Sequence, residues 1–135
     1  MSEINLIMKY LGIPYKHQGR TLEGFDCWGW ILFIYKILRN IELWDIEGDY
    51  PEEWWLEANS FFENYQKKWE RINKPQILDV VLINSERGVA IHAGIMIDKI
   101  RFIHCCKAGV VMNKVTEKIW KNRIAGYFRY KNDKN

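Results

Sequence analysis

The sequence predicts an α+β fold, in which N-terminal helices pack on a C-terminal antiparallel β-sheet. Apolar residues recur at helical spacing only before the dipeptide Lys74-Pro75. Beyond it the apolar runs are short, rich in β-branched residues and separated by turn-forming residues. Helices that precede antiparallel strands in this way favour a sheet that carries the helices on one face.

Three helices are expected in the first half of the chain. Gly12 and Pro14 end the first one, and Asp26 can cap the second one after a polar loop over residues 15–24. The third helix follows a turn-rich loop and precedes Lys74. The expected helices cover residues 2–11, 26–39 and 52–68.

Five strands are expected in the second half. The connections at Asp98-Lys99 and at residues 107–109 are short enough for hairpins, which join antiparallel neighbours. A short helical turn at residues 116–120 precedes the last strand. The expected strands cover residues 78–83, 89–97, 100–105, 110–114 and 124–131.

Length and composition restrict the class of protein. A chain of 135 residues, 48% hydrophobic and 27% charged, suffices for one domain with its own core, expected to span residues 1–135. A net charge of +3 is too small to indicate a nucleic-acid partner. The N-terminal segment lacks the basic region of a secretory signal, and no apolar run reaches the ~20 residues that span a bilayer. We expect synthesis in the cytoplasm without a signal peptide, and no membrane insertion.

The segment Phe25-Asp26-Cys27-Trp28-Gly29 carries the strongest indication of chemistry, because it places a thiol at the start of an almost wholly apolar helix. A helix N-terminus favours a thiolate, so a cysteine there is a better nucleophile than one in the middle of a core. The same cysteine can instead be a small buried core residue. The sequence around it leaves both interpretations open.

A thiol nucleophile also needs a base, and two later histidines can supply it. Side chains alternate along a strand, so His92 and His104 share a face only if the loop between their strands has an odd number of residues. With a loop over residues 97–99, Met96 pairs with Ile100 and His92 stands directly opposite His104. We expect this register, with the N-terminus of the cysteine helix laid across the histidine face.

Together these residues predict a catalytic triad. Cys27 attacks a carbonyl carbon as a thiolate, His92 takes up and returns the proton, and His104 orients His92. The Cys27 backbone N–H can donate to the developing oxyanion. A structural role for each histidine stays open. A metal site of Cys27, His92, His104 and Cys106 is also conceivable, but no ligand spacing typical of zinc supports it, so we expect no metal and no cofactor.

Six short segments, in order along nearly the whole chain, resemble one known family. They are Gly12-Ile13-Pro14-Tyr15, Phe25-Asp26-Cys27-Trp28-Gly29, Asp79-Val80-Val81-Leu82, His92-Ala93-Gly94-Ile95, Phe102-Ile103-His104 and the closing segment from Trp120 to Arg129. They resemble the NlpC-type cell-wall peptidases, which are small papain-like cysteine hydrolases. The likeness is greatest to the branch carried by phage tails and phage-like particles.

The resemblance implies a papain-like fold and cleavage of peptidoglycan stem peptides, typically between the γ-carboxyl of D-glutamate and a diamino acid. It implies that Cys27 is the nucleophile, His92 the base and His104 the orienting residue of a cysteine peptidase. Peptidoglycan peptides are then the expected substrate. Phage-tail proteins are the expected partners, and assembly into a phage or phage-like tail is the expected destination.

The resemblance also implies two substrate-binding or oxyanion-binding residues, and Trp28 is a third candidate at a position where this chain departs from the family. Tyr15 would lie near the thiol and help to bind the substrate or the oxyanion, and Asp26 would bind the free amine of the stem peptide. Many members have a serine where this chain has Trp28, whose indole can instead offer its face to a cation. The usual specificity is therefore open for this chain.

Two other functions stay open beside the peptidase. Aromatic residues make up 15% of the chain, and together with the missing serine they fit a catalytically weak or inactive papain-like subunit of a tail. A thiol acyltransferase or amidase that acts on another substrate would use the same three catalytic residues.

Overall fold

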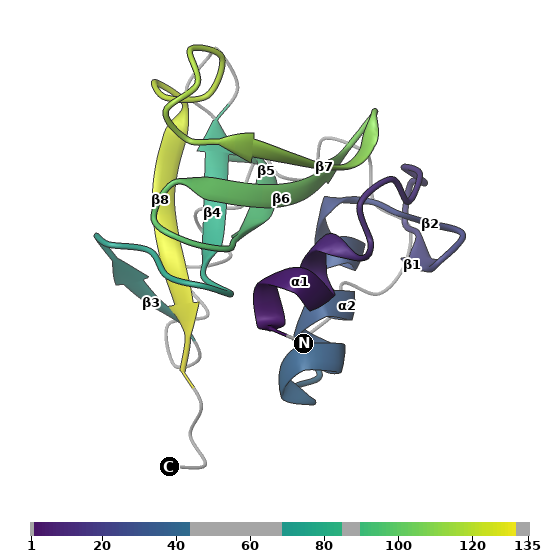
Figure 1. The fold of residues 1–135 in the computed structure, drawn as a ribbon. Coiled ribbons are helices and arrows are strands. Elements are labelled where there is room, and N and C mark those ends of the chain that lie inside the picture. The colour runs from purple at the N-terminus through teal and green to yellow at the C-terminus, as the bar shows by residue number, and fades with distance from the viewer. Residues whose placement is uncertain (1, 44–68, 85–89, 132–135) are drawn as a thin grey trace.

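The computed structural model describes residues 2–43, 69–84 and 90–131, which form two helices, a two-stranded ribbon and a six-stranded sheet (Figure 1). The helices are α1 (Glu3–Met8) and α2 (Cys27–Arg39). The strands are β1 (Arg20–Thr21), β2 (Gly24–Phe25), β3 (Trp69–Ile72), β4 (Val80–Asn84), β5 (Ala90–Met96), β6 (Arg101–Cys106), β7 (Gly109–Lys114) and β8 (Ile124–Tyr130). Within these ranges no helix is long and apolar enough to cross a membrane.

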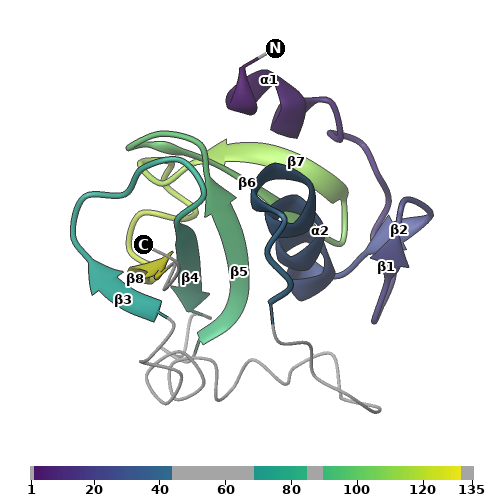
Figure 2. The ribbon, with the colours of Figure 1, turned by 90° about the horizontal axis from the view of Figure 1, so that it is seen from below.

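The large sheet is antiparallel throughout, with the strand order β3-β8-β4-β5-β6-β7. It bends strongly, so that β6 and β7 run across the direction of β4 and β8 (Figure 1). Helix α2 lies beside β5 and β6 (Figure 2). The segment after α1 bonds to the outer edge of β7 through Gly12 N to Val110 O (2.9 Å) and Val110 N to Ile13 O (2.8 Å). This arrangement confirms the predicted α+β class.

Most of the predicted elements are confirmed. The first two helices occur as α1 and α2, and the five strands occur as β4 to β8 with small shifts at their ends. The segment predicted as a helical turn is a hydrogen-bonded turn, in which Trp120 N donates to Glu117 O at 2.9 Å. The helix predicted over residues 52–68 lies outside the described residues.

Three short strands are not predicted by the sequence patterns. Among the described strands, β3 lies at the edge of the sheet beside β8. Two of its four residues are exposed charged residues, so it carries little apolar alternation. Strands β1 and β2 have two residues each and lie in or at the end of the predicted polar loop. Such short strands leave no periodicity to recognise.

Helix α2 begins at Cys27 because Asp26 caps it. The backbone of Asp26 is extended, and its Oδ1 accepts a hydrogen bond from Gly29 N at 2.7 Å. The helix ends at Asn40, whose left-handed conformation (φ 53°) stops the helical hydrogen bonding. The fully buried large side chains between these ends are Trp28, Trp30, Ile31 and Ile34.

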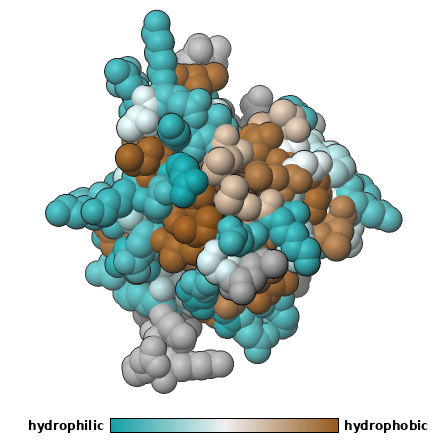
Figure 3. All heavy atoms as spheres, viewed as in Figure 1, coloured by the Kyte–Doolittle hydropathy of each residue, from teal (hydrophilic) through white to brown (hydrophobic). Residues whose placement is uncertain are grey.

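Apolar side chains cover both faces of the bent sheet. The larger cluster joins both helices to one face and includes Ile95 of β5 and Ile103 of β6. The smaller cluster lies on the other face, with Trp120 packed against it, and consists of Val81, Ile83, Met96 and Phe102. On the surface, hydrophobic patches lie between hydrophilic side chains (Figure 3). The exposed large hydrophobic residues include Leu11, Leu22, Ile37, Ile100, Met112 and Ile119.

Close packing of α2 against the loop before β1 requires a glycine at position 29. A Cβ atom added to Gly29 would lie 2.1 Å from the carbonyl oxygen of Gly19 and 2.9 Å from Nη1 of Arg20. A backbone carbonyl cannot move aside as the end of a flexible side chain can. The first turn of α2 and this loop therefore hold each other in place.

We predict that Gly29→Ala lowers the free energy of unfolding by ~1–3 kcal/mol, the usual cost of overpacking. This sign is the reverse of the ordinary helical effect, in which replacing glycine by alanine stabilises by ~1 kcal/mol. Chemical denaturation measures the change. Lys36→Ala on the exposed side of α2 is the control and should cost less than ~1 kcal/mol. A neutral or stabilising Gly29→Ala would contradict the close packing.

Candidate active site

Cys27 is the first residue of α2, as predicted, and the residue is 5% exposed. Its backbone N–H belongs to the first turn, whose N–H groups have no acceptor within the helix. The segment before Cys27 is also bonded to β6, because the Cys105 thiol donates a hydrogen bond to the carbonyl of Phe25 at 2.9 Å. The thiol of Cys27 is thus carried by a rigid helix start.

The two predicted histidines lie side by side. Ile95 pairs with Ile103, and the bond from Ile97 N to Arg101 O (3.0 Å) leaves residues 98–100 as a three-residue turn. The loop is therefore odd-numbered, as the triad requires. The Nε2 atom of His92 lies 2.7 Å from Nδ1 of His104, which is hydrogen-bonding distance.

The register itself differs from the prediction. Met96 pairs with Phe102 instead of Ile100, so continuing the ladder places His104 beside Gly94 and not directly opposite His92. A Cβ added to Gly94 would lie 3.0 Å from Cβ of His104. The missing side chain therefore makes room for His104, and the two imidazoles meet diagonally across the strands.

Helix α2 does not lie across the face that carries the histidines. It packs against Ile103 and Cys105, and the Trp30 indole donates to Ile103 O at 2.9 Å. Side chains alternate along β5 and β6, so His92 and His104 lie on the other face. This part of the prediction is wrong, because the apolar faces of α2 and of the strands determine which side the helix covers.

His104 is completely buried between aromatic rings. Its ring centroid lies 4.6 Å from that of Phe102 and 5.3 Å from that of Trp120, the latter in an edge-on contact. Its Nε2 atom lies 2.7 Å from Oδ1 of Asn113 on β7. Asn113 is not among the predicted site residues. The alternation of β7 next to β6 could have found it, since residues 111 and 113 share the face of His104.

Burial keeps both imidazoles neutral. It lowers the pKa of His92 to about 3, with smaller contributions from His104 and Arg123. Burial also lowers the pKa of His104, against the opposing effects of the Asn113 hydrogen bond and the Glu117 carboxylate. Each neutral ring therefore has one donor and one acceptor nitrogen at neutral pH.

Of the three predicted substrate residues, Tyr15 keeps a position compatible with its role. Its backbone forms a bridge to Phe25, two residues before the thiol, and its ring is half-buried with Lys107 Nζ 4.4 Å from the ring centroid. Asp26 is 4% exposed and accepts hydrogen bonds from Gly29 N, from Gln18 N (3.1 Å) and from Arg20 (2.9 Å).

Trp28 is 1% exposed and belongs to the larger core cluster. A buried indole presents no surface to a ligand, so its burial argues against the predicted substrate contact. Asp26 already accepts these three hydrogen bonds, which tie it to the first turn of α2 and to the loop before it. Both residues belong to the start of α2, and a contact of either one with the substrate stays a prediction.

The remaining cysteines have structural surroundings. Burial, together with Cys106 and Asp26, raises the pKa of the Cys105 thiol to about 12, and Cys106 is half-buried with its Sγ 3.8 Å from Gly109 O. None of the three cysteines is in a disulfide. In the described part of the chain, no cluster of three or more His, Cys, Asp or Glu residues could hold a metal ion.

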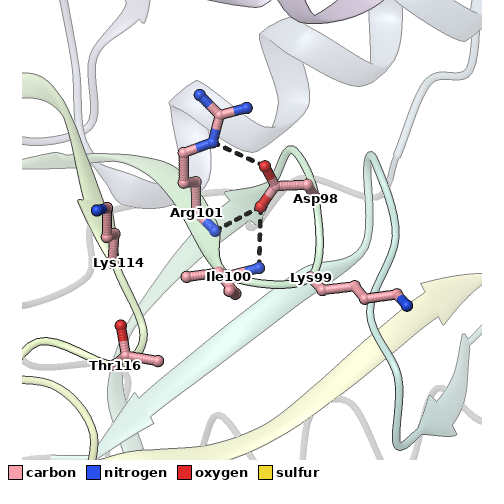
Figure 4. A pocket seen from close by; sticks show the side chains of 6 residues that line it. All are labelled: Asp98, Lys99, Ile100, Arg101, Lys114 and Thr116. Atoms are coloured by element: carbon pink, nitrogen blue, oxygen red, sulfur yellow. Dashed lines mark hydrogen bonds and ion pairs between the residues drawn. The ribbon is translucent and has the colours of Figure 1, made fainter.

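A surface pocket of about 530 Å³ lies elsewhere, at the turn between β5 and β6 (Figure 4). Asp98 orders this turn by accepting hydrogen bonds from Ile100 N (2.9 Å), Arg101 N (2.7 Å) and Arg101 Nε (2.7 Å). None of the predicted catalytic residues lines it. The pocket is lined by Asp98, Lys99, Ile100, Arg101, Lys114 and Thr116.

A cysteine at the start of a buried helix, packed on a bent antiparallel sheet that carries paired histidines, defines a papain-like domain. The chain belongs to the NlpC/P60 family, which matches residues 12–129. Its similarity to solved structures supports the same fold. It superimposes on the NlpC/P60 domain of the peptidoglycan hydrolase SagA with a TM-score of 0.62 at 18% identity, covering 94% of this chain and 95% of that one. An NlpC/P60 family protein from Bacillus cereus gives a TM-score of 0.69 at 23% identity, covering 95% of this chain and 39% of the other.

Two known protein sequences are similar to most of the chain. One is tail tip assembly protein K of Escherichia phage N15, 29% identical over 126 residues, which cover 88% of this chain and 50% of the relative. The other is the probable peptidoglycan endopeptidase LytE of Bacillus subtilis, 27% identical over 120 residues, which cover 89% and 31%. The chain thus spans half or less of the length of these relatives.

The low pKa of His92 predicts that the protein loses stability in acid. The ordinary pKa of a histidine is 6.5, and the pKa of His92 in the folded protein is about 3. Between these two pH values the unfolded state therefore binds more protons than the folded state. The free energy of unfolding should therefore fall as the pH decreases through this range. In chemical denaturation between pH ~4 and ~6, the dependence on pH should be shallower for His92→Gln than for the unchanged protein. Equal slopes would show that folding does not keep His92 neutral.

Proposed function

We propose that this protein is a cysteine peptidase that hydrolyses peptidoglycan stem peptides. The observation that carries the proposal is the pair of His92 and His104, 2.7 Å apart on one face of the sheet, in an NlpC/P60 chain whose α2 begins with Cys27. A neutral imidazole oriented by a second ring is a suitable base for a thiol.

In the proposed reaction, the Cys27 thiol gives its proton to His92 and its sulfur attacks the carbonyl carbon of the scissile amide. The Cys27 N–H stabilises the oxyanion of the tetrahedral intermediate. The intermediate collapses when the C–N bond breaks and His92 returns the proton to the leaving amine, which leaves a thioester. Water then gives a proton to His92 and attacks the thioester carbonyl. The C–S bond breaks, His92 returns the proton to the sulfur, and the carboxylic acid is released and loses its remaining proton to solvent.

For the substrate, we propose the bond between the γ-carboxyl of D-glutamate and a diamino acid. The similarity to LytE and to tail tip assembly protein K supports peptidoglycan as the polymer and a phage or phage-like tail as the assembly. Tyr15, beside the segment that precedes Cys27, is the proposed substrate-facing residue. We further propose that the chain works as a single papain-like domain.

A second candidate is a tail subunit in which the fold is kept for binding alone. The low exposure of Cys27 and the likeness to a tail tip assembly protein favour it. In that case the histidine pair would have only a structural role.

We predict that purified protein cleaves muropeptides that contain a γ-D-glutamyl–diamino acid bond, and that Cys27→Ala abolishes cleavage because it removes the nucleophile. Mass spectrometry of the products measures the cleavage and identifies the bond. Cys106→Ala is the matched control, since it also replaces a cysteine but lies outside the proposed machinery, and it should retain activity.

Alkylation separates the two candidate functions. A nucleophilic Cys27 should react with iodoacetamide at neutral pH, whereas Cys105, with its pKa near 12, should react only after unfolding. Retained cleavage in Cys27→Ala would contradict the peptidase mechanism. A Cys27 as unreactive as Cys105, together with no cleavage, would favour the binding subunit.

A further inference from the structure

We propose that Asn113 and Glu117 are positioning residues, which fix the proton on Nε2 of His104 and thereby orient His92 as the base. This inference rests on the proposed function, but its structural part can be tested without any substrate. It extends the predicted triad by two residues on β7 and on the turn that follows.

Glu117 determines which end of the Asn113 amide faces His104. The Nδ2 atom of Asn113 lies 3.4 Å from Oε1 and 3.5 Å from Oε2 of Glu117. An ionised carboxylate can only accept hydrogen bonds, so the NH₂ end of the amide faces Glu117. The Oδ1 end therefore faces Nε2 of His104, at 2.7 Å.

The direction of each following hydrogen bond is then fixed. An amide oxygen only accepts, so His104 carries its proton on Nε2 and presents a lone pair at Nδ1. That lone pair accepts from Nε2 of His92 at 2.7 Å, so His92 also carries its proton on Nε2. Nδ1 of His92 keeps a lone pair, and this is the nitrogen that would receive the thiol proton.

The backbone around Asn113 and Glu117 holds these two residues in place. Asn113 pairs with Phe102 in the ladder between β6 and β7, and the ring of Phe102 packs against His104. Glu117 is fixed by a hydrogen bond from Lys114 N to its carboxylate, and its own N–H donates to Lys114 O at 3.1 Å. The chain of hydrogen bonds from Glu117 through Asn113 and His104 to His92 therefore depends on hydrogen-bonded backbone at β7 and the turn after it.

A reversed amide would oppose catalysis. With Nδ2 facing Nε2 of His104, this nitrogen would have to accept, and the proton of the neutral ring would move to Nδ1. Two N–H groups would then meet between the rings unless His92 also moved its proton to Nδ1. In that tautomer the base nitrogen is already protonated and cannot take the proton of the thiol.

Three variants separate the role of the acceptor from that of the fold. Asn113→Leu removes the acceptor, and Glu117→Ala leaves it but allows the amide to rotate. The double variant Glu117→Ala/Asn113→Asp offers His104 an acceptor in either orientation, because both ends of an ionised aspartate are oxygens. Asn73→Leu, at an exposed position after β3, is the matched control for the asparagine replacement.

Long-range ¹H–¹⁵N correlation spectra at neutral pH assign the tautomer of each histidine, with His17 as the third, reference ring. We expect the Nε2–H form for His92 and His104 in the unchanged protein and in Asn73→Leu. Asn113→Leu and Glu117→Ala should give mixed tautomers and lower kcat on a stem peptide about tenfold, without a matching change in KM. The double variant should recover both the Nε2–H tautomer and most of kcat.

A proton on Nδ1 of His104 in the unchanged protein would overturn the inference. Unchanged tautomers in both single variants would also overturn it. A double variant no better than Glu117→Ala would show that Glu117 acts only through its turn. These outcomes differ from failure of the proposed function, in which no stem peptide is cleaved while the tautomers of the unchanged protein and its variants still follow the expected pattern.

Discussion

The candidate site depends on the register of β5, β6 and β7. The three-residue turn after β5 places His92 and His104 on one face, and the ladder between β6 and β7 adds Asn113 to it. A slip of one residue in either pairing would move a whole strand's side chains to the other face and break the run of 2.7 Å contacts. Gly94 allows this arrangement because a side chain there would press on His104.

The thiol of Cys27 is carried by helix α2, which packs against the sheet. Asp26 caps α2 and ties its first turn to Arg20 and Gln18, while Gly29 allows the loop before β1 to approach. The layers are joined by polar bonds as well as apolar packing, since Trp30 and Cys105 each bond to a backbone carbonyl across them. The position of the thiol thus follows from the folding of the whole core.

Much of this could be predicted from the sequence, because the deciding features are local. The cap before Cys27, the alternation around His92 and His104 and the short hairpin loops are all visible in adjacent residues. The exact register is not visible in the sequence, because loops over residues 97–99 and 98–100 both have an odd number of residues. The side of the sheet that α2 covers is also not visible, because it depends on contacts between segments far apart in the chain. Burial of Trp28 and the role of Asn113 depend on the same long-range packing.

The central claim is that Cys27 forms a covalent acyl-enzyme during hydrolysis of a stem peptide. Rapid acid quench followed by peptide mass spectrometry tests it directly. The proposed mechanism predicts a thioester between the acyl part of the substrate and the peptide that contains Cys27. Hydroxylamine should remove this adduct, and Cys27→Ala should not form it. Hydrolysis that proceeds without any adduct on Cys27, or with the adduct on Cys105 or Cys106, would contradict it.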